Sequence, residues 1–449
     1  MRPLAPRALA ERHAAAVPRY TSYPTAPHFT GAIGPRQAAA WMSALSDGTE
    51  ISLYVHIPFC RALCWYCGCT TAVANGRGPI SAFLASLDSE MGHAASLLPT
   101  SCRVSHLHWG GGSPNILSPS EIRNLAARTY DLFRVADGAE FAVEIDPRFM
   151  DAERANAFAD AGVNRVSLGV QDFDPKVQAA INRHQSYAQT AHVVALLCEA
   201  GIQALNIDLV YGLPGQTAAS VAATVDKVLA LDPDRVAVFG YAHLPDKIRH
   251  QRLIDSAMLA GPGDRLGQAN RIARKLVAAG YVRVGLDHFA KPNDPLATGT
   301  ARRNFQGYTT DRSDTLIGFG ASAISRFAQG YAQNAAHLLD YQARVEAHGL
   351  GTARGVAMSD EDRLRGHVIE RLMCDLSFSA SDLRRRFGAA ALALIAEASD
   401  IVEADQDGLV EPTSDGFRIT ERGRPFVRTI CACFDAYLGE ETAQFANGA

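Results

Sequence analysis

The sequence predicts an α/β fold in which repeated strand–helix units build a parallel sheet, closed or partly closed into a barrel. Seven short runs rich in apolar and β-branched residues each end near glycine, proline or a charged residue, as strands do. Most of these runs are separated by segments with helical spacing, such as 81–98 and 224–234. In such folds, functional side chains gather at the carboxyl ends of the strands. The expected strands cover residues 51–58, 104–112, 140–147, 163–171, 204–214, 235–245 and 281–289.

The first three expected strands end in segments that suggest a binding site. The run 51–58 ends at Pro58 and opens directly onto a loop that contains four cysteines. The run 104–112 ends in three consecutive glycines, which allow a ligand to approach the backbone closely. The third run carries Glu144 and Asp146, which point the same way because they are two residues apart on a strand. One acid in contact with a ligand is a simpler interpretation than a pair of acid/base carboxylates.

After about residue 355 the pattern changes to helix, helix and hairpin. Residues 359–374 predict an amphipathic helix that begins after an N-cap at Ser359, and 379–388 predict a shorter helix. Residues 408–424 predict a hairpin that turns at Asp415–Gly416. This outline is typical of a mainly helical, winged-helix-like domain. We therefore expect three parts: an N-terminal segment at 1–50, a barrel at 51–350 and a C-terminal domain at 351–449.

Composition excludes several classes of function. The chain has 449 residues, 47% of them hydrophobic, and a formal net charge of -4, so it buries a large core and has no overall attraction to nucleic acid. A winged-helix outline allows DNA binding, but the acidic chain and a single arginine run at 384–386 argue against it. No stretch reaches the roughly 18 apolar residues of a membrane span. The first twenty residues weakly resemble a transit peptide but have no apolar signal-peptide region, so we expect a cytoplasmic protein, and the lack of apolar heptads favours a monomer.

The cysteine loop predicts metal or redox chemistry. Nine cysteines are an odd number and too few for a disulfide scaffold of this length. Cys60, Cys64 and Cys67 have the spacing C-x3-C-x2-C. Structural zinc normally takes four ligands in paired knuckles, whereas a 4Fe–4S cluster on three thiolates leaves one iron open to a small molecule. The spacing therefore favours a cluster over zinc, and a fourth ligand from Cys69 would block the open iron.

Motifs spread over nearly the whole chain, among them 18–26, 53–69, 108–114 and 206–217, resemble those of the oxygen-independent coproporphyrinogen III oxidases, a family of the radical S-adenosylmethionine (SAM) superfamily. The resemblance implies a partial (β/α)6-type radical SAM barrel, with the N-terminal segment over its mouth and the C-terminal domain as a lid. A related branch of haem chaperones shares the barrel motifs but is expected to lack "PRYTSYPT" and the Cys67-Gly68-Cys69 sequence. The residues that carry the resemblance are 18–26, 53–69, 108–114, 143–148, 167–174, 181–185, 206–217, 241–245, 287–292, 303–310 and 430–438.

The resemblance assigns roles to individual residues. It implies that Cys60, Cys64 and Cys67 hold the cluster, and that two SAM molecules bind. The first SAM would contact Tyr54, Gly111, Glu144 and Ile324. The second would contact Tyr66, Gly112, Ser113, Gln171, Arg183, Asp208 and Ala242. Cys69, Tyr54 and Gln306 are the expected catalytic residues, with Cys69 near the cluster rather than bound to it and Gln306 as a polar group that orients the substrate.

The implied reaction converts two propionates of coproporphyrinogen III to vinyl groups and gives protoporphyrinogen IX. It begins with reduction of the cluster, so a one-electron donor such as flavodoxin or ferredoxin is an expected partner, whereas nucleic acid and membranes are not. The substrate carries four carboxylates, and basic side chains at the barrel mouth are needed to bind them. The candidates are Arg19, Lys291, Arg302 and Arg303. A haem-binding, chaperone-like paralogue is the alternative.

Overall fold

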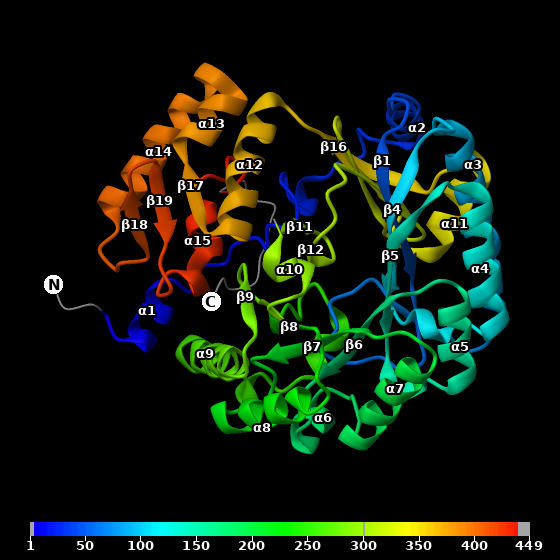
Figure 1. Ribbon diagram of the computed structural model, residues 1–449, viewed down its shortest axis with the longest axis horizontal. Coiled ribbons are helices and arrows are strands. Elements are labelled where there is room, and N and C mark those ends of the chain that lie inside the picture. The colour runs from blue at the N-terminus through cyan, green and yellow to red at the C-terminus, as the bar shows by residue number, and fades with distance from the viewer. Residues whose placement is uncertain (1–3, 300, 439–449) are drawn as a thin grey trace.

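A twelve-stranded sheet forms the centre of the structure, a computed structural model that describes residues 4–299 and 301–438. Seven neighbouring strands are parallel and curve around a common interior, with helices on the outside (Figure 1). In sheet order they are β13 (Thr315–Phe319), β1 (Glu50–Ile57), β4 (Arg103–Gly111), β5 (Val135–Ile145), β6 (Arg165–Gln171), β7 (Ala204–Tyr211) and β8 (Arg235–Gly240). The main helices that follow these strands are α3 (Gly78–Leu97), α4 (Pro119–Leu132), α5 (Ala152–Asp160), α6 (Pro175–Ala180), α7 (Tyr187–Glu199), α8 (Ala218–Leu229) and α9 (Pro262–Ala278).

Alternation along the strands explains why polar side chains face the interior of the barrel. In β6, Val166, Leu168 and Val170 are buried in the main hydrophobic core. The residues between them line the interior instead, because successive side chains of a strand point to opposite faces. The same alternation in β7 turns Asn206 and Asp208 inward. The barrel therefore encloses a cavity into which polar and charged side chains project beside apolar ones, rather than a filled apolar core.

Six of the seven expected strands are confirmed as β1, β4, β5, β6, β7 and β8. The seventh expectation, a single further strand at 281–289, was wrong. The segment turns at Gly285, whose φ is +53°, and forms two short strands, β9 (Val282–Val284) and β10 (His288–Ala290). Strand β10 pairs antiparallel with both β8 and β9, so the parallel repeat ends at β8.

The opposite edge of the sheet carries strands that the periodicity did not predict. Strand β13 pairs with β1, and three antiparallel strands extend the sheet beyond it. These strands are β14 (Ile324–Phe327), β15 (Gly330–Asn334) and β16 (Thr352–Ala357), with helix α11 (Leu338–His348) between β15 and β16. The sheet thus continues past residue 350, where the barrel was expected to end.

The C-terminal part confirms both expected helices and the hairpin. Helix α12 (Asp360–Asp375) begins after Ser359, which forms a capping box with Asp362, and α13 (Ala380–Phe387) begins after Ser379. The hairpin consists of β18 (Val410–Thr413) and β19 (Gly416–Ile419). Three elements were not expected: β17 (Ser377–Ser379), which pairs with β19, α14 (Ala391–Ala404) and α15 (Val427–Ala432). The winged-helix outline stays a prediction, and residues 1–3 and 439–449 of the expected terminal parts lie outside the described chain.

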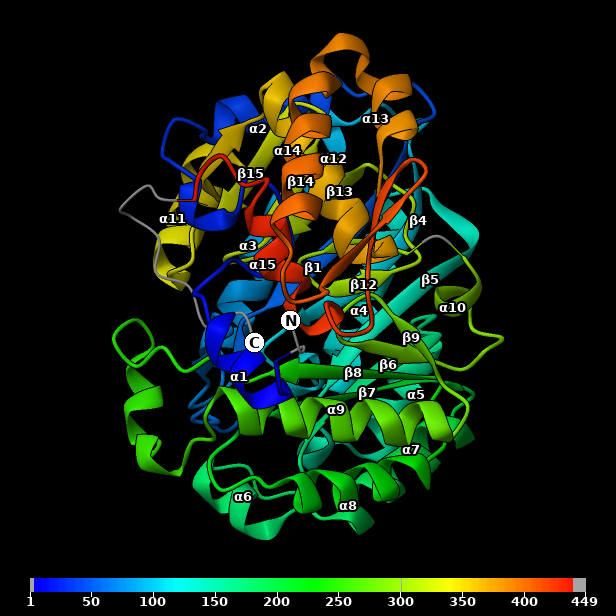
Figure 2. The same ribbon diagram turned by 90° about the vertical axis from the view of Figure 1, so that its left-hand side faces the viewer.

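The N-terminal segment joins the barrel to the C-terminal part. Helix α1 (Pro6–Arg12) lies beside α9 and below the C-terminal strands (Figure 2). Leu9, Tyr20 and Tyr23 belong to the same hydrophobic core as the C-terminal helices. Helix α2 (Pro35–Ser43) follows and leads into β1. The remaining short elements are β2 (Phe59–Cys60), β3 (Ala72–Val73), α10 (Pro295–Thr298), β11 (Arg302–Asn304) and β12 (Gly307–Thr309).

A buried glutamate fixes the added edge of the sheet to the helical layer. Glu90 of α3 accepts four hydrogen bonds, two on each carboxylate oxygen, over 2.8–2.9 Å. The donors are the backbone N–H groups of Gly320 and Gly351 and the side chains of Asn334 and Tyr341. These donors flank β13, β15, α11 and β16, so one side chain holds four segments together.

We predict that Glu90→Gln lowers the free energy of unfolding by about 1–3 kcal/mol, because an amide N–H2 group would face two of the four donors. Burial raises the pKa of Glu90 to about 7, so its contribution is complete below the unfolded pKa and is lost as pH rises through about 7. Urea unfolding at about pH 5 and about pH 8 should therefore show the stability gap narrowing as pH rises. Asp88→Asn, on the exposed side of the same helix, is the control. If the difference in stability between the wild type and Glu90→Gln instead grows with pH, the four hydrogen-bond donors lower the pKa of Glu90 more than burial raises it.

Candidate active site

The interior of the barrel contains a cavity of about 720 Å³ that opens at the carboxyl ends of the strands. Most of the site residues predicted from sequence line it together. Those that do so are Cys60, Cys64, Tyr66, Cys67, Cys69, Gly111, Gly112, Ser113, Glu144, Gln171, Arg183, Asp208, Ala242 and Gln306. Tyr54 and Ile324 do not line it. The Tyr54 hydroxyl lies 3.0 Å from His56 Nδ1, and its ring lies against His108, which lines the cavity.

The glycine run forms a cradle that leaves no room for side chains. A Cβ at Gly110 would lie 2.8 Å from the Glu144 carboxylate, and one at Gly112 would lie 2.4 Å from the carbonyl oxygen of Phe59. Gly111 has a φ of +108°, which other residues rarely adopt. Gly111 and Gly112 line the cavity, so main-chain groups of this strand end border it. This geometry fits a small molecule held by main-chain groups, as expected for SAM.

Each of the three thiols predicted to hold the cluster has a polar hydrogen near its sulfur. Ser113 Oγ lies 3.8 Å from Cys60 Sγ, Arg148 Nη2 lies 3.4 Å from Cys64 Sγ, and the Cys69 N–H lies 3.4 Å from Cys67 Sγ. A hydrogen bond from the Cys69 side chain lowers the pKa of Cys67 to about 6. Donors directed at sulfur are a typical setting for iron–sulfur ligands. Cys69 thus acts toward Cys67 as a donor, and the residues present fit a cluster on three cysteines.

A single-ion site is not evident in the described residues. Within 4–299 and 301–438, no three His, Cys, Asp or Glu side chains converge closely enough to hold one metal ion. A cubane does not require that convergence, because its cysteine ligands bind separate irons.

Asp146 joins the cysteine loop to two arginines. Its carboxylate pairs with Arg148 at 2.6 Å and with Arg183 at 3.3 Å, and all three side chains are buried. Both guanidinium groups also reach Cys64 Sγ, at 3.4 and 3.5 Å. Burial opposes the charge of Asp146, but Arg183 and Arg148 hold its pKa below the ordinary value. If Arg183 binds SAM as predicted, its guanidinium must do so while it remains paired with Asp146.

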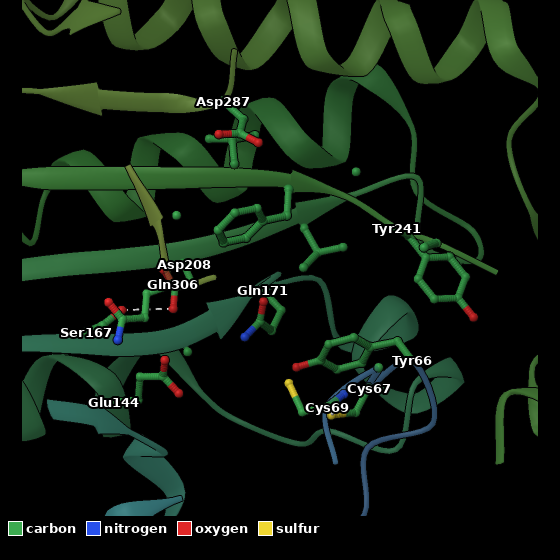
Figure 3. A pocket seen from close by; sticks show the side chains of 18 of the residues that line it. Tyr66, Cys67, Cys69, Glu144, Ser167, Gln171, Asp208, Tyr241, Asp287 and Gln306 are labelled. Carbon is green, nitrogen blue, oxygen red and sulfur yellow. Dashed lines mark hydrogen bonds between the residues drawn. The ribbon is translucent and has the colours of Figure 1, made fainter. Parts of the chain in front are cut away.

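Glu144 of β5 and Asp208 of β7 face the cavity from the two strands that flank β6, and their electrostatic surroundings differ (Figure 3). Glu144 accepts from the Gly111 N–H at 3.0 Å and lies 3.2 Å from His108 Nε2. Burial opposes its charge, but these hydrogen bonds keep the pKa of Glu144 below the ordinary value. Burial raises the pKa of Asp208 to about 6, despite a hydrogen bond from Ser167. Both carboxylates can accept hydrogen bonds from ribose hydroxyls when ionised.

Gln171 is held in an unusual conformation at the end of β6. Its φ is +67°, in the left-handed region that non-glycine residues seldom adopt, and the pairing of β6 with β7 is irregular beside it. Strain of this kind gathers at ligand sites because the surrounding structure enforces it. Figure 3 shows Gln171 on the same side of the cavity as Tyr66 and Cys69. This placement supports a ligand role over simple capping of the strand.

Two of the four predicted substrate-binding cations lie outside the cavity. Lys291 pairs with Asp232 at 2.9 Å, and Arg302 pairs with Glu370 and Asp314 at 2.9 Å each, so both are already neutralised elsewhere. Arg19 and Arg303 do line the cavity. Sequence reasoning missed Arg265, Arg283 and Arg428, which join them from α9, β9 and α15. No local sequence pattern distinguishes these three arginines from ordinary surface arginines. His56 and His108, in contrast, lie within the motifs at 53–69 and 108–114, so the sequence could have suggested them as site residues.

The segment between β8 and α9 (241–261) holds the cysteine loop by backbone contacts. His250 Nε2 lies 2.7 Å from the carbonyl oxygen of Cys67. The buried Gln251 donates to the carbonyls of Tyr66 and Ala242 at 3.1 Å each and accepts from the Leu244 N–H at 2.6 Å. One glutamine thus connects two segments that are predicted to contact the second SAM.

Two family models match parts of the chain. The model described as the radical SAM superfamily matches residues 54–228. The model described as the HemN C-terminal domain matches residues 358–426. The first match covers the cysteine loop and the strands β4 to β7 that surround the cavity.

Curated relatives match nearly the whole chain. An oxygen-independent coproporphyrinogen III oxidase of Bradyrhizobium diazoefficiens is 47% identical over 94% of this chain and 95% of its own length. The enzyme of the same name from Pseudomonas aeruginosa is 42% identical over 96% and 95%. A solved structure of coproporphyrinogen III oxidase (HemN) from Escherichia coli, described as a radical SAM enzyme, has a TM-score of 0.89 and 38% identity, over 94% of this chain and 98% of that one.

We predict that Gln251→Glu loosens the 241–261 segment, because a carboxylate keeps the bond from Leu244 but loses both donated bonds. Each lost bond leaves a carbonyl without its partner, and the free energy of unfolding should fall by about 1–3 kcal/mol. Limited proteolysis should cut faster within the segment, as mass spectrometry of the fragments would show. Gln37→Glu, at an exposed position of α2, is the control. Equal cleavage of both variants would contradict the bridging role.

Proposed function

Since this chain belongs to the oxygen-independent coproporphyrinogen III oxidases, a family of radical SAM enzymes, we propose that its cavity binds coproporphyrinogen III and that two propionates of this substrate become vinyl groups there. The product is protoporphyrinogen IX, an intermediate of haem biosynthesis. The chain is accordingly an oxidoreductase. The chaperone-like alternative has no support among the relatives.

One observation carries the proposal beyond the family likeness: the cavity is strongly cationic in an acidic protein. Of the described residues, nine arginines but only five carboxylates line it. The whole chain has a formal net charge of -4. Buried charges need partners, and guanidinium groups match carboxylates in geometry as well as in charge. Arg235 and Arg283 already pair with Asp294 and Glu421 outside the lining, so the four carboxylates of the substrate would bind at other arginines of the cavity.

The cofactors are a 4Fe–4S cluster and SAM. Cys60, Cys64 and Cys67 would hold the cluster, and the described thiols fit that role. When bound, the pair supplies a carbon radical that removes a hydrogen atom from a propionate. The residue sets given above for a first and a second SAM are part of the proposal, and the cradle at Gly110–Gly112 supports the first of them.

Arg19 and Arg303 are proposed to bind substrate carboxylates. Arg303 is buried, and its Nε and Nη1 atoms have no hydrogen-bond partner within the described residues. Its nearest carboxylate, on Asp287, is 3.9 Å away, and its guanidinium lies 4.5 Å from the centre of the Tyr308 ring. Burial lowers the pKa of Arg19, and the charge of Arg303 adds to this shift. An anion between the two would relieve both the repulsion and the unpaired donors.

The N-terminal and C-terminal parts are proposed to close the cavity and exclude water. Thr21, Pro425 and Arg428 line it beside residues of the barrel. Arg428 donates to the carbonyls of Val17 and Pro18, and this contact between the C-terminal part and the N-terminal segment supports such a closure. Gln306, in the turn between β11 and β12, is proposed to orient the substrate, since Asn304 fixes its side chain at 3.1 Å. These placements support the division into segment, barrel and lid.

Anaerobic incubation of the reconstituted enzyme with coproporphyrinogen III, SAM and dithionite tests the function. Formation of the divinyl product with release of carbon dioxide is expected. Binding of haem without turnover would favour the chaperone-like alternative.

We predict that Arg303→Gln raises KM for coproporphyrinogen III about 10-fold to 100-fold, because a charged hydrogen bond contributes about 1.5–3 kcal/mol. Anaerobic turnover at varied substrate concentration gives the value. The control is Arg302→Gln, one residue away, whose side chain is paired outside the cavity. If both variants change KM equally, Arg303 does not contact the substrate.

We predict that Cys69→Ser retains an almost complete cluster but loses most product formation, whereas Cys67→Ser loses the cluster. Cys69 lines the cavity, and its N–H lies 3.4 Å from Cys67 Sγ, which supports a role beside the cluster rather than as a fourth ligand. Iron content and visible absorption measure the first effect, and product analysis measures the second. An iron-free Cys69→Ser protein would make Cys69 a ligand, and a fully active one would leave it a packing role only.

A further inference from the structure

The cluster site is separated from solvent by a single chain segment on one side. Residues 248–251 pack directly on the cysteine loop: His250 reaches the Cys67 carbonyl at 2.7 Å and Gln251 reaches that of Tyr66 at 3.1 Å. The Ile248 side chain closes over Gly68, with 3.8 Å to the position of a Cβ there. The other side of this segment, around Arg249 and Arg252, faces solvent. A molecule seated there would lie one segment away from a predicted cluster ligand.

That outer side combines cations with exposed apolar side chains. Arg249 and Arg252 are exposed in a 3-10 helix (Arg249–Leu253), where residues three apart lie on the same side. Within the described chain neither forms an ion pair with a carboxylate, and Arg252 donates only to the Pro245 carbonyl at 2.9 Å. Leu253 is 58% exposed and Met258 is 47% exposed. Arginine and methionine beside exposed apolar surface are typical of protein interfaces.

The other face near the cluster site offers less to a charged partner. There Arg61 stacks on Phe149, which also contacts Arg148, the neighbour of Cys64. Arg148 is already paired with Asp146, and Arg154 with Asp151. The arginines of this face are thus mostly neutralised, so the 248–258 side is the better match to an acidic protein.

We propose that the exposed side of residues 248–258 is the docking surface for an acidic one-electron carrier protein that reduces the cluster. The inference rests on the proposed function, which requires one electron from outside the chain. The carrier loses one electron and the cluster gains it, and no bond forms or breaks in this step. Arg249 and Arg252 steer the acidic carrier, while Leu253 and Met258 give it an apolar contact.

The test uses flavodoxin as the probe and the double variant Arg249→Glu with Arg252→Glu. Calorimetric titration of oxidised flavodoxin into the protein should show a Kd at least about tenfold weaker than for the wild type at low salt, and a smaller dependence on salt. Turnover supported by reduced flavodoxin should fall, whereas turnover supported by dithionite should not change. The matched control is Arg271→Glu with Arg274→Glu, two exposed arginines three apart on α9 that make the same change in net charge.

Three outcomes would overturn the proposal. They are unchanged flavodoxin binding in the double variant, an equal loss in the control, and a loss that appears instead in Arg61→Glu. Failure of the proposed function is a different result, because the wild type would then form no product even with dithionite.

Discussion

The site depends on a buried ion pair that crosses three segments. Asp146 at the end of β5 holds Arg148 and Arg183, and both guanidinium groups reach the sulfur of Cys64. Because these charges are buried, removing one partner would leave the others without compensation, at a cost of about 3–5 kcal/mol. The cysteine loop therefore takes its position from the strand ends around it. The glycine run, the hydrogen bonds of Gln251 and the shape of the cavity all depend on this position of the cysteine loop.

The sequence predicted the central strands well because their signal is local. Each run of apolar residues is long enough to show its ends, and the loops after β1, β4 and β5 carry the residues that line the cavity. Strands β13 to β16 were missed because each is short and because β13 pairs with β1, more than two hundred residues earlier. Such pairing leaves no trace in local periodicity. The single strand expected at 281–289 failed for a related reason, since a turn at Gly285 divides it into two antiparallel strands.

The motif residues line one cavity, as expected, whereas the lining side chains that arrive from distant helices were not predicted. The cysteines, the glycine run and Gln171 follow expected strands, so topology alone brings them together. Arg265 and Arg428 come from α9 and α15, where each resembles an ordinary surface arginine in sequence. Lys291 and Arg302, also candidates, lie outside the cavity lining and pair with nearby carboxylates. Which cation is left for a ligand is decided by the tertiary structure.

The charge of the cavity bears on when the product leaves. Nine arginines face five carboxylates among the described lining residues, and the substrate enters with four negative charges. Each propionate that becomes a vinyl group loses a hydrogen atom, an electron and neutral carbon dioxide, so the molecule carries one negative charge fewer. Attraction is therefore strongest for the unreacted molecule, intermediate after one conversion and weakest after two. If these arginines bind the substrate as proposed, they would favour a second turnover on the half-converted molecule and release of the finished one.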